Sequence, residues 1–253
     1  RLLLVLTATG AAFGWPFGDT STYATNRDGS VLYFSSSLRM KGTTQYLHPK
    51  IFVWEAGKGI RLFEERASDV PAEPPAGGWD GSEYFYLRGV DVSSDGSTVS
   101  IVGHRFCTTT ACANQETYQT SVYGPGQRVI RLPGVAALSR NGRYAVLSSS
   151  TSLYSWPPAL VSLPVVDLQT GQRTNYSGWN LSTGHSVPSA GRPLANDGTL
   201  LLTTAAGLSL ARGGQTTALS IPAFTSWITP WINDAATLVV YYSINSQLAV
   251  YSI

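Results

Sequence analysis

The sequence has few charged residues, few cysteines and no long apolar run. Charged residues make up 13% of the 253, and the formal net charge is only +2. Lysine is nearly absent and the arginines are scattered, so the basic patch that a nucleic-acid partner requires is missing. No stretch reaches the ~20 consecutive apolar residues of a membrane span. We therefore expect neither a nucleic-acid partner nor a membrane-spanning segment.

The motifs of common catalytic and cofactor sites are also missing. The chain has no G-x-S-x-G, no H-E-x-x-H, no P-loop, and no G-x-G-x-x-G after a predicted strand. Its carboxylates are few, and turn structure explains those of Asp28, Asp95 and Asp197. We expect no cofactor, no metal and no catalytic residue, although propellers that are enzymes assemble their sites from distant loops.

A tight polar turn followed by an apolar strand recurs along the chain. Asp or Asn before Gly lets the backbone reverse through positive φ, so two antiparallel strands leave with matched twist. The five turns are TNRDG (25–29), SSDG (93–96), LSRNG (138–142), LANDG (194–198) and the degenerate INDAA (232–236). Such a repeat predicts an architecture of similar units.

A second hairpin follows the first in most repeats. These hairpins are IFVWEAGKGIRLF (51–63), TSVYGPGQRVIRL (120–132), PVVDLQTGQRTNY (164–176) and LSLARGGQTTALS (208–220). Two hairpins give four strands per repeat, A to D, but the last repeat has only SQLAVYSI (246–253) as its third strand. The prediction is an all-β protein, a β-propeller of about five four-stranded antiparallel blades, the last one incomplete or closed by an N-terminal strand.

Residues 25–63 resemble the TolB-like or WD40-like propeller repeats, which have an S-x-D-G turn, an apolar strand and then I-Y-x-x-D/E-x-x-x-G-x-x-x-x-L. The resemblance covers nearly all of residues 22–253. It implies a fold and not an activity, because propellers serve as scaffolds, ligand binders and enzyme domains. The only Trp-Asp pair, Trp79-Asp80, lies in a predicted loop, and the Asp-box of sialidases is absent.

The first 14 residues have two interpretations. Residues 1–14 have the order of a secretory signal that lacks its first residues: one basic residue, an apolar run and small residues. Alternatively, residues 2–7 form the strand that completes the last blade. Residues 15–253 are predicted to be the propeller domain, as part of a longer polypeptide.

Cys107 and Cys112 lie in one predicted loop, CTTTAC. In an exported protein we expect them to form a disulfide. Free thiols and a metal pair are the alternatives, but two cysteines supply only two of the ligands that a metal needs.

Topology predicts where a ligand binds. The A–B and C–D turns fall on one end of the blades and are tight, so we expect that end to be featureless. The B–C and D–A connections fall on the other end and include long segments, 35–50, 66–84, 103–117, 148–163 and 177–192. They carry the predicted ligand-binding residues Trp79, His104, Arg105, Trp156, Trp179 and His185. The alternative is that these side chains fill loop cores and blade interfaces.

These observations predict a secreted or periplasmic propeller that is not an enzyme and binds a protein, peptide or glycan through its long loops. The alternative is a propeller-type polysaccharide hydrolase or lyase, or the propeller domain that accompanies a peptidase.

Overall fold

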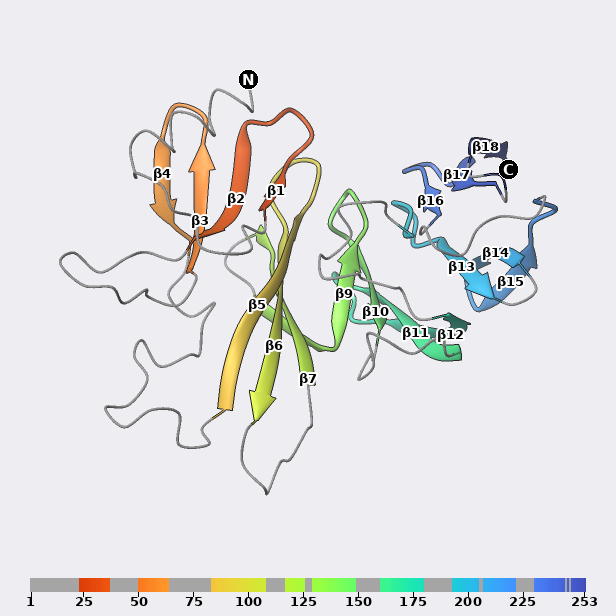
Figure 1. The fold of residues 1–253 in the computed structure, drawn as a ribbon, viewed down its shortest axis with the longest axis horizontal. Helices are drawn as coiled ribbons and strands as arrows, with labels where there is room; N and C mark the ends of the chain where they lie inside the picture. The colour runs from red at the N-terminus through yellow and green to blue at the C-terminus, as the bar shows by residue number, and fades with distance from the viewer. Residues whose placement is uncertain are drawn as a thin grey trace.

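The computed structural model describes residues 23–36, 50–63, 83–107, 117–125, 129–148, 160–179, 193–204, 207–221, 230–243, 245 and 247–253. The elements within these ranges are all β-strands, and they form five antiparallel sheets. Each sheet is built from strands that are consecutive in the chain. We call the sheets blades 1 to 5 in chain order, and they follow one another in space in this order (Figure 1). The predicted N-terminal closing strand, residues 2–7, lies outside the described residues.

Three sheets have four strands. Blade 1 contains β1 (Tyr23–Thr25), β2 (Val31–Ser36), β3 (Lys50–Glu55) and β4 (Gly59–Leu62). Blade 2 contains β5 (Glu83–Val92), β6 (Val99–Cys107), β7 (Thr117–Tyr123) and β8 (Val129–Pro133). Blade 3 contains β9 (Val135–Leu138), β10 (Tyr144–Ser148), β11 (Leu160–Asp167) and β12 (Arg173–Trp179).

The other two sheets have three strands in the part of the chain that the structure describes. Blade 4 contains β13 (Leu200–Thr204), β14 (Gly207–Arg212) and β15 (Gln215–Ala218), and a single bridge between Leu194 and Leu200 replaces its first strand. Blade 5 contains β16 (Trp231–Ile232), β17 (Leu238–Tyr242) and β18 (Leu248–Ser252). The prediction of four-stranded antiparallel blades, about five in number, is confirmed.

The A–B turns have one hydrogen-bond pattern. In blade 2 the N–H of Gly96 donates to the Ser93 carbonyl at 3.0 Å, and the N–H of Ser97 donates to Asp95 Oδ1 at 3.0 Å. The bond from a backbone N–H to the side-chain oxygen of the residue two positions earlier recurs in three other blades. It measures 3.0 Å from Ser30 to Asp28, 3.1 Å from Arg143 to Asn141 and 2.9 Å from Thr199 to Asp197. Asp28, Asp95, Asn141 and Asp197 therefore occupy equivalent places in their turns.

Successive side chains of strand B point alternately toward the preceding blade and toward the following blade. In blade 3, Ala145 and Leu147 pack in the core shared with blade 2, and Val146 packs in the core shared with blade 4. A shift of one residue reverses the two faces of a strand. In blade 4 Leu200 and Leu202 face backwards and Leu201 faces forwards, which keeps all three leucines in a core.

The length of the turn produces this register. In blades 1, 2, 3 and 5 the first turn residue donates its N–H to the carbonyl five residues later, as Ser139 does to Tyr144. In blade 4 Ala195 donates to Thr199, only four residues later. The LANDG turn is thus one residue shorter, and Leu200 takes the backward-facing place that Ala145 has in blade 3.

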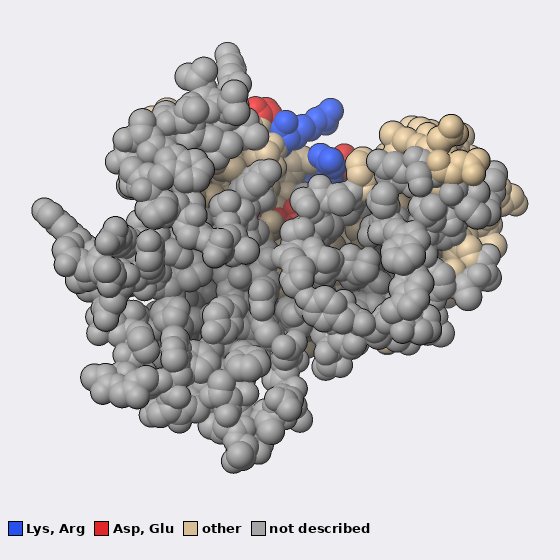
Figure 2. All heavy atoms as spheres, viewed as in Figure 1, with Lys and Arg blue, Asp and Glu red and all other residues tan. Residues whose placement is uncertain are grey.

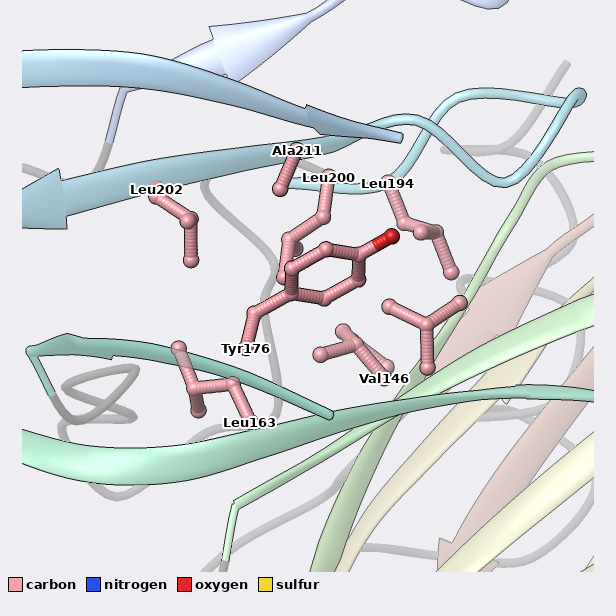
Figure 3. Close-up of a cluster of buried hydrophobic side chains, with 9 residues drawn as sticks. Val146, Leu163, Tyr176, Leu194, Leu200, Leu202 and Ala211 are labelled. Carbon is pink, nitrogen blue, oxygen red and sulfur yellow. The ribbon is translucent and has the colours of Figure 1, made fainter. Parts of the chain in front are cut away.

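The hydrophobic core consists of four clusters, one at each interface between consecutive blades. Figure 3 shows the cluster between blades 3 and 4, where Tyr176 and Leu163 meet Leu200 and Leu202. Each fully buried aliphatic side chain contributes about 1.5–3 kcal/mol. Alternate residues of strand B lie in these clusters: Tyr33, Val99, Ile101, Ala145 and Leu147 are buried, and Val31 packs half-buried beside them.

Polar side chains also join neighbouring blades. The Thr120 hydroxyl donates to the Gly134 carbonyl at 2.8 Å and accepts the N–H of Ala136 at 3.0 Å. The Tyr176 hydroxyl accepts the N–H of Gly214 at 3.1 Å. A buried hydroxyl needs such partners, so these bonds fix each pair of blades in one orientation.

The turn glycine of one blade packs against the start of strand B in the preceding blade. A Cβ added at Gly142 would lie 2.6 Å from Thr98 Cβ, and one added at Gly198 would lie 3.0 Å from the Tyr144 ring. Both glycines also have positive φ, +70° and +84°. Gly therefore satisfies two demands here, a left-handed backbone and a close approach between blades.

We expect Gly142→Ala to destabilise the protein by about 2–4 kcal/mol, since it combines a strained φ with overpacking. The matched control is Gly171→Ala, which has a similar φ of +77° but no neighbouring atom within 4 Å. Urea unfolding of both variants measures the difference. An equal loss in the two would show that the contact between the turn and Thr98 adds nothing.

Candidate functional site

The predicted ligand-binding residues His104 and Arg105 lie in strand β6 and not in a loop. The β5–β6 ladder continues to the pair Glu83–Cys107, and Arg105 is paired with Phe85 and Thr117. The prediction of a loop from residue 103 is wrong because Tyr and Phe on both sides favour a longer ladder than the turn spacing suggests. Strand β6 therefore carries both residues to the B–C end of blade 2.

The other predicted residues are placed only in part. Trp179 is the last residue of β12 and is paired with Leu160, also at the B–C end of its blade. Trp79, Trp156 and His185 lie outside the described residues, and so does Cys112, whereas Cys107 ends β6. The grouping of these residues into one site and the disulfide both stay predictions.

The B–C and D–A connections differ in length between blades. Gly134 alone links β8 to β9, and residues 205–206 alone link β13 to β14. Long connections follow β2, β4, β6, β10, β12 and β15, between residues 36 and 231. Every blade is therefore flanked by at least one long connection at this end.

The opposite end of the blades is built from the A–B turns, which hydrogen-bond to one another in series. The N–H of Arg27 donates to the Ser94 carbonyl at 3.1 Å, and the N–H of Ser94 donates to the Arg140 carbonyl at 2.6 Å. The N–H of Asn196 donates to the Asp234 carbonyl at 3.0 Å. Neighbouring turns are thus fixed relative to each other by the same bond.

The link between turns 3 and 4 uses side chains. The Asn141 N–H donates to Asn196 Oδ1 at 2.8 Å, and the Asn141 side-chain amide donates to the Asn196 carbonyl at 2.9 Å. The side chain of Asn141 donates this bond while its Oδ1 accepts the N–H of Arg143 at 3.1 Å, whereas the carboxylate of an Asp could only accept. All five A–B turns are therefore connected, and we call this set the turn chain.

The turn end is charged, contrary to the expectation that it is featureless. Arg143 pairs with Asp167 at 2.9 Å, Arg212 with Asp197 at 3.1 Å, and Arg140 with Asp234 at 3.4 Å. Charged side chains in Figure 2 gather at the top of the view, over the β1–β2 and β9–β10 turns of Figure 1. These pairs could not be predicted from the sequence, because their members are distant in the chain. Exposed pairs of this kind contribute about 0–1 kcal/mol each.

Three carboxylates at this end have lowered pKa values, which favours their charged form. Hydrogen bonds from Ser30 hold the pKa of Asp28 below its usual value. Burial acts to raise the pKa of Asp95, but hydrogen bonds from Ser93 and Ser97 outweigh it and lower the pKa. Burial also acts to raise the pKa of Asp167, but hydrogen bonds from Arg143 and from two backbone N–H groups outweigh it and lower the pKa. A general acid needs a raised pKa, so these groups have structural roles and not that catalytic one.

The described residues contain no group of three or more His, Cys, Asp or Glu side chains that could hold a metal ion. Nor does the described part of the chain contain a helix long and apolar enough to cross a membrane.

Comparison with solved structures shows the fold class. The β-propeller domain of the Trilobed protease from Pyrococcus furiosus is similar at a TM-score of 0.51 and 9% identity, over 92% of this chain and 68% of that one. Prolyl oligopeptidase B from Galerina marginata is similar at a TM-score of 0.48 and 11% identity, over 93% of this chain and 33% of that one. No protein-family model and no curated protein matches the sequence. The chain is thus an all-β propeller of about five blades.

We expect the stability of the protein to fall as the pH drops below about 4, the unfolded pKa of Asp. The pKa of folded Asp95 is depressed, so its contribution is present above that pH and is lost as the pH falls through the folded pKa. Asp95→Asn keeps the acceptor for Ser97, as Asn141 does in turn 3, but does not titrate. Thermal unfolding from pH 7 to pH 2.5 should show a shallower acid loss in Asp95→Asn than in the unchanged protein. Parallel pH curves would contradict this role of Asp95.

Proposed function

We propose that this propeller is a binding module without catalytic activity, which recognises a neutral glycan, peptide or protein at its B–C end. The observation that carries the proposal is the division between the two ends. At the turn end, the side chains of Asp95, Asn141 and Asp197 accept hydrogen bonds from backbone N–H groups of their own turns. The variable connections lie at the other end, where a rigid scaffold presents them.

The residues we assign to binding are those predicted from the sequence: Trp79, His104, Arg105, Trp156, Trp179 and His185. Aromatic rings with a few polar neighbours suit stacking and hydrogen bonding to a sugar or a peptide. The low overall charge does not favour steering of a strongly ionic partner. The repeats are further proposed to be of the TolB-like or WD40-like kind.

We expect Trp156→Ala and Trp179→Ala to weaken binding at least tenfold while the melting temperature stays nearly unchanged, as for exposed anchors. A glycan and peptide array finds the ligand, and calorimetry measures its affinity for each variant. Trp231→Ala is the matched control, because Trp231 is 40% exposed and lies in blade 5. A large loss of stability without loss of binding would show that the two rings are core residues.

The proposed location is secreted or periplasmic, with a disulfide between Cys107 and Cys112. Thiol titration of the denatured, unreduced protein should find no free thiol, since an oxidising compartment allows the bond to persist. Two titratable thiols would contradict both the disulfide and the proposed location.

A second candidate is that the propeller accompanies a peptidase in a longer polypeptide. It is supported by the likeness in fold to the propeller domain of the Trilobed protease. In that case the B–C end would face the peptidase and not a free ligand. Binding to no member of the array, by a folded protein, would favour this candidate over the first.

A further inference from the structure

The last strand of blade 4, β15, is exposed along its whole length. In β4 and β8, the last strands of blades 1 and 2, exposed residues alternate with half-buried or buried ones, as in strands that pack by one face. In β15 all four residues, Gln215–Ala218, are exposed. The ladder with β14 therefore holds β15 in place, and neither face of the strand is covered.

The outer edge of β15 carries backbone groups that point away from the sheet. The N–H of Leu219 donates to the Leu208 carbonyl in β14 at 2.9 Å. Residues of an antiparallel strand alternate between bonding to one neighbour and pointing their N–H and C=O groups to the other side. Thr217 therefore also bonds to β14, whereas Thr216 and Ala218 present their N–H and C=O groups at the outer edge. Among the described residues, β14 is the only strand paired with β15.

This edge lacks the features that keep other strands from pairing with it. Proteins protect exposed edges with charged side chains, proline or bulges. The last strand of blade 1 contains Arg61, that of blade 2 contains Arg131 and Pro133, and that of blade 3 begins with Arg173. β15 contains none of these, and its register with β14 is unbroken. Its edge is therefore open to one more strand.

The neutrality of this segment suits pairing with its own copy. A two-fold axis that places a strand antiparallel to itself sets each residue opposite itself or a near neighbour. A charge in the strand would then lie close to the same charge, which is destabilising. Residues 213–233 contain no charged side chain, so this repulsion does not arise.

One register satisfies the outward backbone groups of both copies. With each Thr217 opposite the other, Thr216 of either copy lies opposite Ala218 of its neighbour. All four residues of these two pairs point their N–H and C=O groups to the shared edge, so both pairs are of the hydrogen-bonded kind. The central pair joins two threonines, a favourable cross-strand combination.

We propose that β15 pairs antiparallel with β15 of a second copy of this chain, so that the two copies of blade 4 form one continuous sheet. The contact uses the same edge on both molecules, and the assembly therefore closes as a dimer. One short strand a side buries less surface than a stable interface needs, so the dimer forms only as the concentration rises. This inference does not depend on the proposed ligand-binding end.

The first test is sedimentation equilibrium of the purified chain over a hundredfold range of concentration. The mean mass of the unchanged protein should rise toward that of a dimer and not beyond it. Thr217→Lys and Thr217→Glu each place like charges opposite one another, so each should weaken association at least tenfold. An equal mixture of the two variants should regain the dimer, because the charges are then opposite.

The matched control is Asn175→Lys, which adds a charge at an exposed place in β12, the last strand of blade 3. This variant should associate like the unchanged protein. Circular dichroism checks that all variants are folded, which the exposure of Thr217 leads us to expect.

Hydrogen exchange measured by NMR identifies the edge that pairs. The amide N–H groups of Thr216 and Ala218 should exchange more slowly as the concentration rises, while that of Thr217, which bonds to β14, changes little. A monomer at every concentration overturns the proposal. Association that Thr217→Lys does not reduce, or that leaves the exchange of Thr216 and Ala218 unchanged, overturns it as well.

Discussion

The hydrogen bonds between successive A–B turns are the constraint on which the other contacts depend. The bond between the N–H of Arg27 and the Ser94 carbonyl, and its counterparts along the turn chain, set how close two blades approach at one end. At that distance a Cβ on Gly142 would collide with Thr98, so the glycine is required by the spacing as well as by its φ. The apolar clusters then fill the space between consecutive blades.

The turn chain also explains how the repeat tolerates sequence change. The backbone N–H and the side-chain amide of Asn141 each donate a hydrogen bond to Asn196, so two bonds replace a backbone–backbone bond and the link between turns 3 and 4 is kept. Blade 4 loses one residue from its turn, but three successive leucines follow, so a buried side chain occupies each face in the new register. In blade 5 Ala236 occupies the glycine place at a φ of 56°, and the turn still forms. The turns therefore keep their form and their bonds to one another although individual residues differ between repeats.

The sequence predicts much of this fold because its signals are local. Asp95-Gly96 and the alternating residues after it determine a turn, a strand and a buried face within ten positions. The backbone bonds between turns could not be predicted, since they join groups 38 to 67 residues apart and carry no side-chain signature. For the same reason the length of β6 was underestimated: its end depends on pairing with β5 and β7, so His104 was assigned to a loop.

The candidate site was less accessible to prediction than the fold. A propeller collects binding residues from several blades, so no spacing in the sequence marks them as neighbours. The structure shows which connections are too short to contribute to a binding site. The two-residue link between β13 and β14 and the single Gly134 between β8 and β9 offer little surface for a ligand. At the other end the carboxylates are committed to turns and ion pairs, with lowered pKa values at Asp28, Asp95 and Asp167. The proposed recognition of a neutral partner therefore depends on the aromatic and histidine side chains of the long connections, which alternate in the sequence with charged residues such as Arg66 and Asp69.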